Sequence, residues 1–423
     1  MLSSKNAKLS GITNELKATV GWTTLFLSTA PPPSWWTNTA LSTLRRASAR
    51  ETKVFKMNVI FEELHGQHGA RIGIATLDAA KSLNALTLPM IEALDAKLQA
   101  WATDPQIVCV LLRGNGPKAF CAGGDVIDLV EACRAHPGEV PPLAARFFAD
   151  EYRLDHRIHT YPKPLICWAH GYVMGGGMGL MQGAGVRIVT PSSKLSMPEI
   201  SIGLFPDVGG SWFLSRLPGK LGTFLGLSAA QVNARDALDL GMADRFMRDD
   251  QQEPLLEGLL QLNWQEQSAT QLNSLLRALE LQAREQLPEA QWLPRRARID
   301  ALLDVADAAS AWQALTSLKD DEDALLARAA KTLAKGCPLT AQLVWQQVRR
   351  ARHLSLAEVF RMEYAVSLNC CRNPEFPEGV RALLIDKDNQ PQWHWPEVAQ
   401  IAPAVIDAHF KPSWEGEHPL ADL

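Results

Sequence analysis

The stretch "PLICWAHGYVMGGGMGL", residues 164–180, contains the transition that decides how this chain folds. It begins as an apolar run of strand length, residues 164–173, and passes through three consecutive glycines into small and apolar residues. Backbone amides exposed at such a turn can converge on an anion or on a polarised carbonyl oxygen. The stretch therefore predicts a buried strand, a functional loop and a helix in succession.

The same alternation continues on both sides of this stretch. Strands are expected within residues 58–78, at 107–114 and at 186–190, and helices at 86–104 and 126–135. Strands that alternate with helices indicate an α/β architecture. From about residue 250 the sequence is rich in Leu, Ala, Glu and Gln with helical periodicity. We expect an N-terminal extension over residues 1–56, an α/β catalytic core over 57–250 and a helical C-terminal region over 251–423.

The composition argues against several classes of protein. The chain has 423 residues, is 47% hydrophobic and 21% charged, and carries a formal net charge of −4. Nothing in this balance favours a nucleic-acid partner or an anionic membrane. Its seven cysteines show no Cys-x-x-Cys spacing and its ten histidines form no metal motif, so we predict no metal site. An odd number of cysteines outside a disulfide framework indicates reduced thiols.

Residues 1–56 differ in character from the rest of the chain. They are rich in Ser, Thr, Trp and Pro, with weak periodicity and basic residues near their end. We interpret them as an upstream-extended start or a disordered extension of a cytoplasmic protein. The alternative is a transit peptide that directs the protein to the mitochondrial matrix.

Two further motifs carry chemistry. The stretch "AFCAGGD", residues 119–125, is a second glycine-rich loop between a buried strand and a helix, and amides from two such loops can form an oxyanion hole. The stretch "MPEISIGLFPDVGG", residues 197–210, places Glu199 and Asp207 in apolar, turn-rich sequence. Burial of an unpaired carboxylate is unfavourable or raises its pKa. A structural role for the two acids is an N-cap and a salt bridge, and a functional role is a catalytic pair.

Several familiar site signatures are absent from the sequence. Neither glycine-rich loop has the Gly-x-Gly-x-x-Gly pattern with a downstream acid, and there is no phosphate-binding loop of the Gly-x-x-x-x-Gly-Lys-Ser/Thr type. There is also no Gly-x-Ser-x-Gly nucleophile elbow. Nucleotide-phosphate binding of these kinds and serine-hydrolase chemistry are therefore disfavoured.

Taken together, the motifs resemble the crotonase, or enoyl-CoA hydratase/isomerase, superfamily over residues 57–248. Within it, "KSLNALT" at residues 81–87 and "MPEISIGLFPDVGGSWFLSRLPG" are most similar to a hydrolase branch. The C-terminal stretch "MEYAVSLNCCRNPEFPEGVRALLIDKDNQPQW", residues 362–393, is similar to the helical segment of that branch. The resemblance implies a crotonase-like spiral of ββα units with a mostly helical C-terminal region.

The resemblance also implies roles for particular residues. It implies that the backbone amides of Gly124 and Gly176 form an oxyanion hole for an acyl-CoA thioester carbonyl. It implies Glu199 and Asp207 as the catalytic pair. Glu151 is implied as a further substrate-binding residue, together with Gly176, Glu199 and Asp207.

The activity that the resemblance implies is hydrolysis of the thioester of 3-hydroxyisobutyryl-CoA to 3-hydroxyisobutyrate and free CoA, a step of valine catabolism. Hydratases of the superfamily carry a glutamate two residues beyond the triple glycine, where this chain has Gly179. An enoyl-CoA isomerase or hydratase and a non-catalytic acyl-CoA-binding protein are the alternatives. In the hydrolase, either Glu199 attacks the thioester directly or one carboxylate activates water.

The expected partner is an acyl-CoA substrate, with CoA lying along residues 81–87 and 120–124 and with Lys81 as a candidate phosphate partner. No cofactor is expected, because CoA enters as part of the substrate. No nucleic acid and no membrane are expected, and a homo-oligomer is an open alternative to a monomer. Cys121 and His170 lie beside the motifs, but Cys121 is interpreted as a small buried residue and not as a nucleophile.

Overall fold

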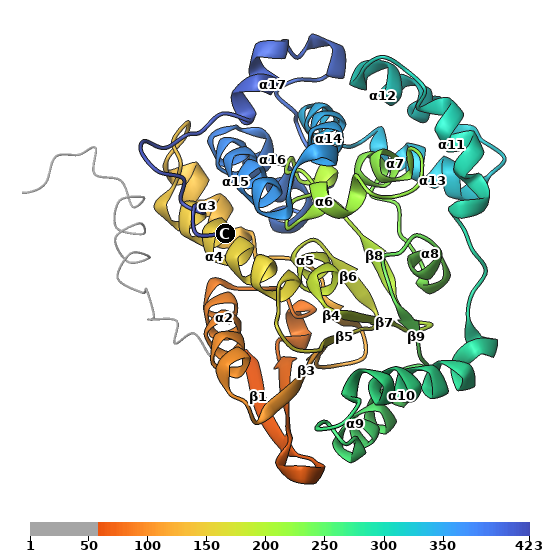
Figure 1. The fold of residues 1–423 in the computed structure, drawn as a ribbon. Helices are drawn as coiled ribbons and strands as arrows, with labels where there is room; N and C mark the ends of the chain where they lie inside the picture. The colour runs from red at the N-terminus through yellow and green to blue at the C-terminus, as the bar shows by residue number, and fades with distance from the viewer. Residues whose placement is uncertain (1–57) are drawn as a thin grey trace, which may run out of the picture. The chain divides into compact units, whose positions relative to one another are not determined.

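The computed structural model of the chain describes residues 58–423, whose strands and helices are drawn in Figure 1. The predicted extension over residues 1–56 lies outside the described residues. Strands and helices alternate up to β9, and only helices and turns follow it. The prediction of an α/β fold with a mostly helical C-terminal region is confirmed.

The strands form two sheets. The larger sheet has the strand order β1-β2-β3-β5-β7-β9, in which the β1–β2 pair is antiparallel and the other neighbours are parallel. The smaller sheet has three parallel strands in the order β4-β6-β8. The strands are β1 (Val59–His65), β2 (Arg71–Leu77), β3 (Ile107–Gly114), β4 (Ala119–Cys121), β5 (Leu165–Ala169), β6 (Tyr172–Met174), β7 (Val186–Val189), β8 (Lys194–Ser196) and β9 (Arg245–Phe246).

The prediction of one continuous strand at residues 164–173 is wrong, because the chain bends at Gly171 and forms two strands, β5 and β6. This residue has φ 60°, and a β-carbon on it would lie 2.2 Å from the carbonyl oxygen of Lys118. Only glycine fits such a close backbone approach with a left-handed conformation. β5 therefore stays in the larger sheet while β6 pairs with β4 and β8. The pairs β3–β4, β5–β6 and β7–β8 each pass in this way from the larger to the smaller sheet.

Alternate side chains of the larger sheet face two different layers. Ile72 and Ile74 of β2 point toward α9 and α10, whereas Ala75 and Leu77 belong to the main core with α2. Figure 1 shows α9 and α10 at one end of the molecule and α2, α4 and α5 beside the strands. The helices of the α/β part are α2 (Leu88–Thr103), α3 (Ile127–Ala135), α4 (Pro142–His159), α5 (Gly176–Gly183), α6 (Gly210–Leu214), α7 (Leu221–Ser228) and α8 (Ala234–Asp239).

The C-terminal helices pack against the helices that carry the site. α15 contacts α4, α14 contacts α7, and α16 contacts α3. The start of α15 is fixed by a capping box, in which Ser355 and Glu358 accept each other's backbone N–H. The helices are α9 (Gln252–Gln261), α10 (Ser268–Ala283), α11 (Arg296–Leu302), α12 (Ala308–Thr316), α13 (Ala324–Leu333), α14 (Pro338–Arg350), α15 (Leu356–Arg372), α16 (Glu375–Val380) and α17 (Pro403–His409), with a π-helical turn η9 (Arg381–Ile385) after α16.

Candidate active site

The three strands of the smaller sheet lead into three of the predicted site residues. Gly124 follows β4, Gly176 follows β6, and Glu199 begins a short 3-10 turn η3 (Glu199–Ser201) after β8. Because these strands are parallel neighbours, their carboxyl ends lie at one edge of the sheet. Residues that are far apart in the sequence therefore meet at this edge.

Gly124 and Gly176 lie against each other at the edge. A β-carbon on Gly176 would lie 3.5 Å from the Gly124 nitrogen and 2.7 Å from Glu151 Oε1. Gly176 is the first residue of α5, so its N–H belongs to the helical turn that has no acceptor within the helix. Gly124 is bridged to Leu86, which aligns the loop at 81–87 with the loop at 119–125. The backbone groups of the two loops thus border a small space, which we call the cradle, and any side chain at Gly176 would fill it.

Glu199 reaches the same cradle from η3. Its Oε1 lies 3.0 Å from the position of a β-carbon on Gly175. The residue is 4% exposed, and its Oε2 has no hydrogen-bond partner among the described residues. Burial raises the pKa of Glu199 well above its usual value, and the charge of Asp207 raises it further. Burial therefore favours the protonated form of the Glu199 carboxyl.

The carboxylate of Asp207 differs from that of Glu199, because Asp207 accepts a hydrogen bond from another side chain. The hydroxyl of Tyr152, on α4, donates to Asp207 Oδ2 at 2.7 Å and lies 2.6 Å from Ser367 Oγ, on α15. Burial raises the pKa of Asp207 to about 6, and the Tyr152 hydrogen bond opposes this rise. The two acids of the predicted pair thus differ in environment, because a side-chain hydroxyl stabilises the carboxylate of Asp207, whereas Glu199 Oε2 has no partner among the described residues.

The loop that carries Asp207 is strained and is held by a buried acid. Val208 has φ 51° and Gly209 has φ 82°, and a left-handed conformation is unfavourable for a β-branched residue. Glu363, on α15, accepts the backbone N–H groups of Gly209 and Ser211, each at 2.8 Å. These groups begin α6, so Glu363 satisfies two of its unpaired amides and fixes the position of Asp207.

Acidic side chains of α4 lie against the glycines of α5. Glu151 Oε1 is 2.7 Å from a β-carbon built on Gly176, and Asp155 Oδ2 is 2.8 Å from one built on Gly179. A side chain at Gly179 would also lie 2.7 Å from Val208 Cβ. The position where hydratases of the superfamily carry an acid thus has no room for one here, and an acid from the neighbouring helix, Asp155, occupies the adjacent space.

Five buried acids therefore lie together with no Lys or Arg side chain paired to them among the described residues. Each is at most 4% exposed, and none forms an ion pair with a Lys or Arg in the part of the chain that the structure describes. Burial is the largest cause of the raised pKa at every one of them, and it brings the pKa of Glu363 to about 8. Burial therefore favours the neutral form of these carboxyls, because burial of several charged carboxylates together is unfavourable. The five acids are Glu151, Asp155, Glu199, Asp207 and Glu363.

The cysteine and histidine beside the motifs do not form a nucleophile and base. Burial raises the pKa of Cys121 to about 12, so its thiol is not ionised near neutral pH. Its Sγ donates to the Gly123 carbonyl oxygen, whereas the His170 ring bonds to the carbonyl oxygen of Gly116. Cys121 is a buried residue of β4, as the sequence predicted.

Lys81, the predicted phosphate partner of CoA, lies on the surface in a short turn before Leu86. Within residues 58–423 no group of three His, Cys, Asp or Glu side chains could hold a metal ion. In the same part of the chain no helix is both long and apolar enough to cross a membrane. The predicted absence of a metal and of a cofactor remains a prediction.

Sequence reasoning missed three buried polar residues of this site. Tyr152 and Asp155 lie on α4 near Glu151, and Glu363 lies on α15. The spacing of Asp155, four residues after Glu151, places both on one helix face and could have indicated it. Glu363 lies three residues after the buried Phe360 on a helix whose inner face is apolar. No local pattern distinguished Tyr152.

Comparisons with known proteins agree with this geometry. The model of the enoyl-CoA hydratase/isomerase family matches residues 72–410. A crystal structure of a carnitinyl-CoA dehydratase from Mycobacterium thermoresistibile superposes with a TM-score of 0.74 at 32% identity, covering 84% of this chain and 97% of that one. A crystal structure of an enoyl-CoA hydratase from Rhodobacter sphaeroides has a TM-score of 0.72 at 30% identity, covering 84% and 98%. The chain belongs to the enoyl-CoA hydratase/isomerase family, and its fold is the crotonase fold.

Curated relatives give a more specific likeness within this family. The mitochondrial 3-hydroxyisobutyryl-CoA hydrolase of Danio rerio is 37% identical over 352 residues, covering 83% of this chain and 89% of the relative. The protein of the same name from Homo sapiens is 34% identical over 339 residues, covering 80% and 86%. The likeness extends over most of both chains, including the helical C-terminal region.

Proposed function

We propose that the protein hydrolyses the thioester of 3-hydroxyisobutyryl-CoA to 3-hydroxyisobutyrate and free CoA. The observation that carries the proposal is the meeting of the Gly124 and Gly176 loops with the buried acids Glu151, Glu199 and Asp207. A pair of backbone amides suits the oxyanion of an acyl-transfer intermediate. The name of the relatives from fish and man supports the same substrate.

In the proposed mechanism Asp207 is the base, because its pKa of about 6 leaves it ionised near neutral pH. Asp207 takes a proton from water, and the water oxygen attacks the thioester carbon. The amides of Gly124 and Gly176 stabilise the oxyanion, at roughly 3–4 kcal/mol for each donor where such bonds have been removed. Collapse of the intermediate breaks the C–S bond, and Glu199 gives its proton to the departing sulfur. Transfer of the proton from Asp207 to Glu199 restores the starting state.

The competing route is direct attack by Glu199, which gives a mixed anhydride that water then hydrolyses. A rapid-quench experiment separates the two routes. In the water route CoA and 3-hydroxyisobutyrate form at the same rate in the first turnover. A burst of CoA ahead of the acid product would establish the anhydride instead.

We propose that Glu151 binds the 3-hydroxyl group of the substrate. Its Oε1 is buried without a partner among the described residues and lies beside Gly176. A site whose buried polar group is left unpaired by an analogue rejects that analogue strongly. We expect kcat/KM for isobutyryl-CoA, which lacks the hydroxyl, to be at least about 100-fold lower than for 3-hydroxyisobutyryl-CoA. Similar values for the two esters would exclude this role.

The function is tested by the appearance of free thiol. The wild-type protein is incubated with 3-hydroxyisobutyryl-CoA and, separately, with crotonyl-CoA, whose hydration is followed by loss of the enoyl absorbance. We expect thiol release from the hydroxyacyl ester and no hydration of crotonyl-CoA. If both esters bind and neither is converted, the protein is an acyl-CoA-binding protein and the hydrolase proposal is refuted.

A hydratase or dehydratase is the second candidate, because the solved structures that superpose well carry these activities in their names. The absence of an acid at Gly179 argues against it. Loss of the enoyl absorbance of crotonyl-CoA without thiol release would establish this candidate.

The remaining proposals concern cofactor and compartment. We propose that no cofactor takes part, since the amides and acids suffice for thioester hydrolysis. The names of the relatives give no support to the predicted cytoplasmic location and favour the mitochondrial alternative. Import of the full chain, but not of residues 57–423, into isolated mitochondria would support a transit function for residues 1–56.

A further inference from the structure

Two buried thiols meet where α3 packs against α15. Cys133 lies on α3 and Cys371 lies near the end of α15, and each is 2% exposed. The Cys371 thiol donates a hydrogen bond to the Cys133 sulfur, so the two sulfurs are in direct contact. All seven cysteines of the chain are free in the structure. Two free thiols in contact across two helices can be joined by a two-electron oxidant.

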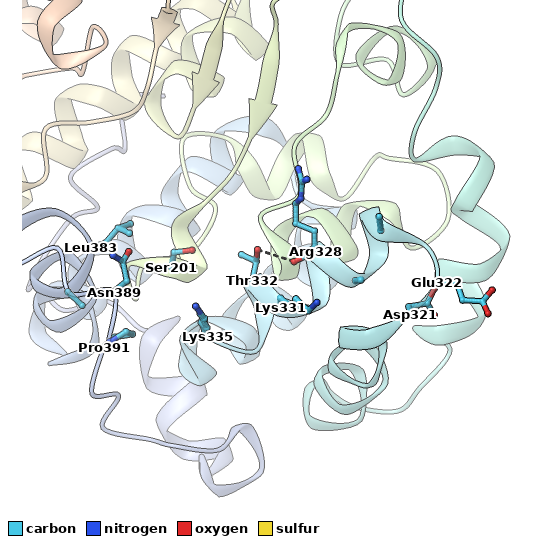
Figure 2. Close-up of a pocket in the computed structure, with 13 residues that line it drawn as sticks. Ser201, Asp321, Glu322, Arg328, Lys331, Thr332, Lys335, Leu383, Asn389 and Pro391 are labelled. Carbon is cyan, nitrogen blue, oxygen red and sulfur yellow. Dashed lines mark hydrogen bonds between the residues drawn. The ribbon is translucent and has the colours of Figure 1, made fainter.

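A cavity of about 490 Å³ connects this pair with the solvent, and we call it the thiol cavity. It is lined by both cysteines, by the turn between α3 and α4 and by the segment after α15, and its rim includes the exposed residues Pro137 and Gln392. A larger cavity of about 740 Å³ lies between α13 and the segment after α16 (Figure 2), and none of the described residues that line it is a cysteine. Small polar oxidants therefore reach the pair through the thiol cavity.

Cys133 is the more reactive of the two thiols. The hydrogen bond from Cys371 lowers the pKa of the Cys133 thiol, whereas the same hydrogen bond and burial raise the pKa of the Cys371 thiol. The other five cysteines also have raised pKa values, with burial as the largest cause. Because the thiolate is the nucleophile, Cys133 is the cysteine best suited to attack an oxidant.

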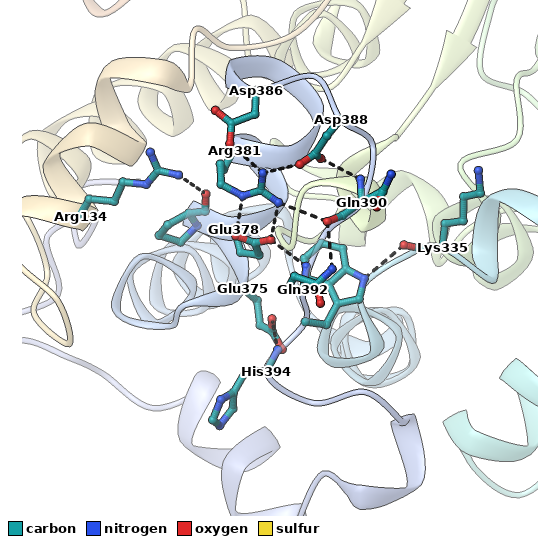
Figure 3. Close-up of polar contacts among 12 residues, drawn as sticks. Arg134, Lys335, Glu375, Glu378, Arg381, Asp386, Asp388, Gln390, Gln392 and His394 are labelled. Carbon is teal, nitrogen blue, oxygen red and sulfur yellow. Dashed lines mark hydrogen bonds and ion pairs between the residues drawn. The ribbon is translucent and has the colours of Figure 1, made fainter.

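Hydrogen bonds hold the segments that carry the two thiols side by side. The guanidinium of Arg134, on α3, donates to the Pro377 carbonyl oxygen of α16 at 3.3 Å, as Figure 3 shows. The guanidinium of Arg372, the last residue of α15, donates to the Gly138 carbonyl oxygen in the turn after α3 at 3.1 Å. The two bonds thus run in opposite directions between the same two parts of the chain.

We propose that Cys133 and Cys371 are a redox modification site, which hydrogen peroxide oxidises to a disulfide that joins α3 to α15 and lowers kcat. The Cys133 sulfur attacks one peroxide oxygen, the O–O bond breaks, and a sulfenic acid and one water are formed. The Cys371 sulfur then attacks the sulfenic sulfur, the S–O bond breaks, and a second water leaves with the Cys371 proton. The two sulfurs together lose two electrons, which peroxide gains. A dithiol reductant reverses the reaction by thiol–disulfide exchange.

The disulfide joins two elements that hold different parts of the candidate active site. α3 begins at Ile127, just after the loop that contains Gly124. α15 carries Glu363, which accepts two backbone amides of the loop that follows Asp207. Sulfurs that share a hydrogen bond lie farther apart than the disulfide bond length of about 2.05 Å, so oxidation draws α3 and α15 together. A small displacement of catalytic groups has a large effect on rate.

The disulfide is tested by peptide mapping of the full chain after treatment with hydrogen peroxide. Digestion with trypsin and a glutamate-specific protease should give residues 132–134 linked to residues 364–372 in wild type. The link should persist in Cys370→Ser, the matched control beside Cys371, and should be absent from Cys371→Ser. In Cys371→Ser the Cys133 sulfenic acid should remain and react with dimedone. The absence of the link from wild type, or its presence in Cys371→Ser, would overturn the proposal.

The effect on catalysis rests on the proposed function, whereas the disulfide does not. It is measured by loss of the thioester absorbance of 3-hydroxyisobutyryl-CoA after the peroxide is removed. Oxidation should lower kcat of wild type by about tenfold, with recovery in dithiothreitol, and should leave kcat of Cys133→Ser unchanged. An unchanged kcat of the linked protein, or an equal loss in Cys133→Ser, would overturn this effect. If reduced wild type hydrolyses no thioester, the proposed function fails and the peptide map still decides the disulfide.

Discussion

Replacement of Tyr152 by phenylalanine removes one hydroxyl from the centre of the site and should move the pH dependence of catalysis. The Tyr152 hydroxyl donates to Asp207 Oδ2 at 2.7 Å inside a cluster of acids. A hydrogen bond to a charged group contributes about 1.5–3 kcal/mol, and about 1.4 kcal/mol corresponds to one pKa unit. The pKa of Asp207, about 6 with the bond in place, should therefore rise by roughly one to two units without it.

The assay is kcat/KM for thiol release between pH 5 and 9. Because the base must be ionised, the acidic limb of the Tyr152→Phe profile should move toward higher pH by the same one to two units. Activity at pH 7 should fall about two- to tenfold and return at pH 9. Tyr161→Phe is the matched control, since the Tyr161 hydroxyl bonds to the Leu98 carbonyl oxygen away from the acids. An acidic limb that stays in place, or moves to lower pH, would refute Asp207 as the base.

Three further predictions concern stability. Burial raises the pKa of Asp155 well above its usual value, so the contribution of Asp155 to stability falls as the pH rises above about 4. The Asp155→Asn variant should therefore show a smaller fall in the free energy of unfolding between pH 5 and 8 than wild type. Equal falls for the two proteins in urea titrations would contradict this. Glu363→Ala should lower the free energy of unfolding by about 2–4 kcal/mol, because two amides at the start of α6 lose their acceptor, and Glu363→Gln should lower it less. Gly179→Ala should lower it by about 1–3 kcal/mol through overpacking, measured by the same titrations, and an unchanged midpoint would show that α5 can shift.

Local sequence patterns predicted much of the fold. The helix expected at residues 86–104 is present as α2, with Met90, Leu94 and Trp101 buried as their spacing indicated. The bend at Gly171 escaped prediction, because the apolar run continues through it and the reason for the bend is a contact with the Lys118 carbonyl oxygen. That contact joins segments distant in the sequence, and periodicity within one segment carries no information about it.

The residues of the candidate site were likewise only partly predictable from local sequence patterns. Glycine-rich loops indicated the stretches 119–125 and 164–180, and acids in apolar sequence indicated Glu199 and Asp207. The choice of Gly124 and Gly176, and the assignment of all four residues to one site, came from a family resemblance. The structure explains their meeting by the parallel strands of the smaller sheet.

Residues that act through another residue were the ones missed. Glu363 lies on a helix more than 150 residues beyond Asp207 and holds the loop of Asp207 through backbone amides. Such a role is visible only when the two segments are packed together.

The most direct test of the whole account is free-thiol release from 3-hydroxyisobutyryl-CoA by wild type, Glu199→Gln and Asp207→Asn, with binding of the ester measured for each protein. The account predicts release by wild type, and a loss of at least about 1,000-fold in kcat for either variant with ester binding retained. Release at the wild-type rate by either variant would contradict the assignment of the two acids.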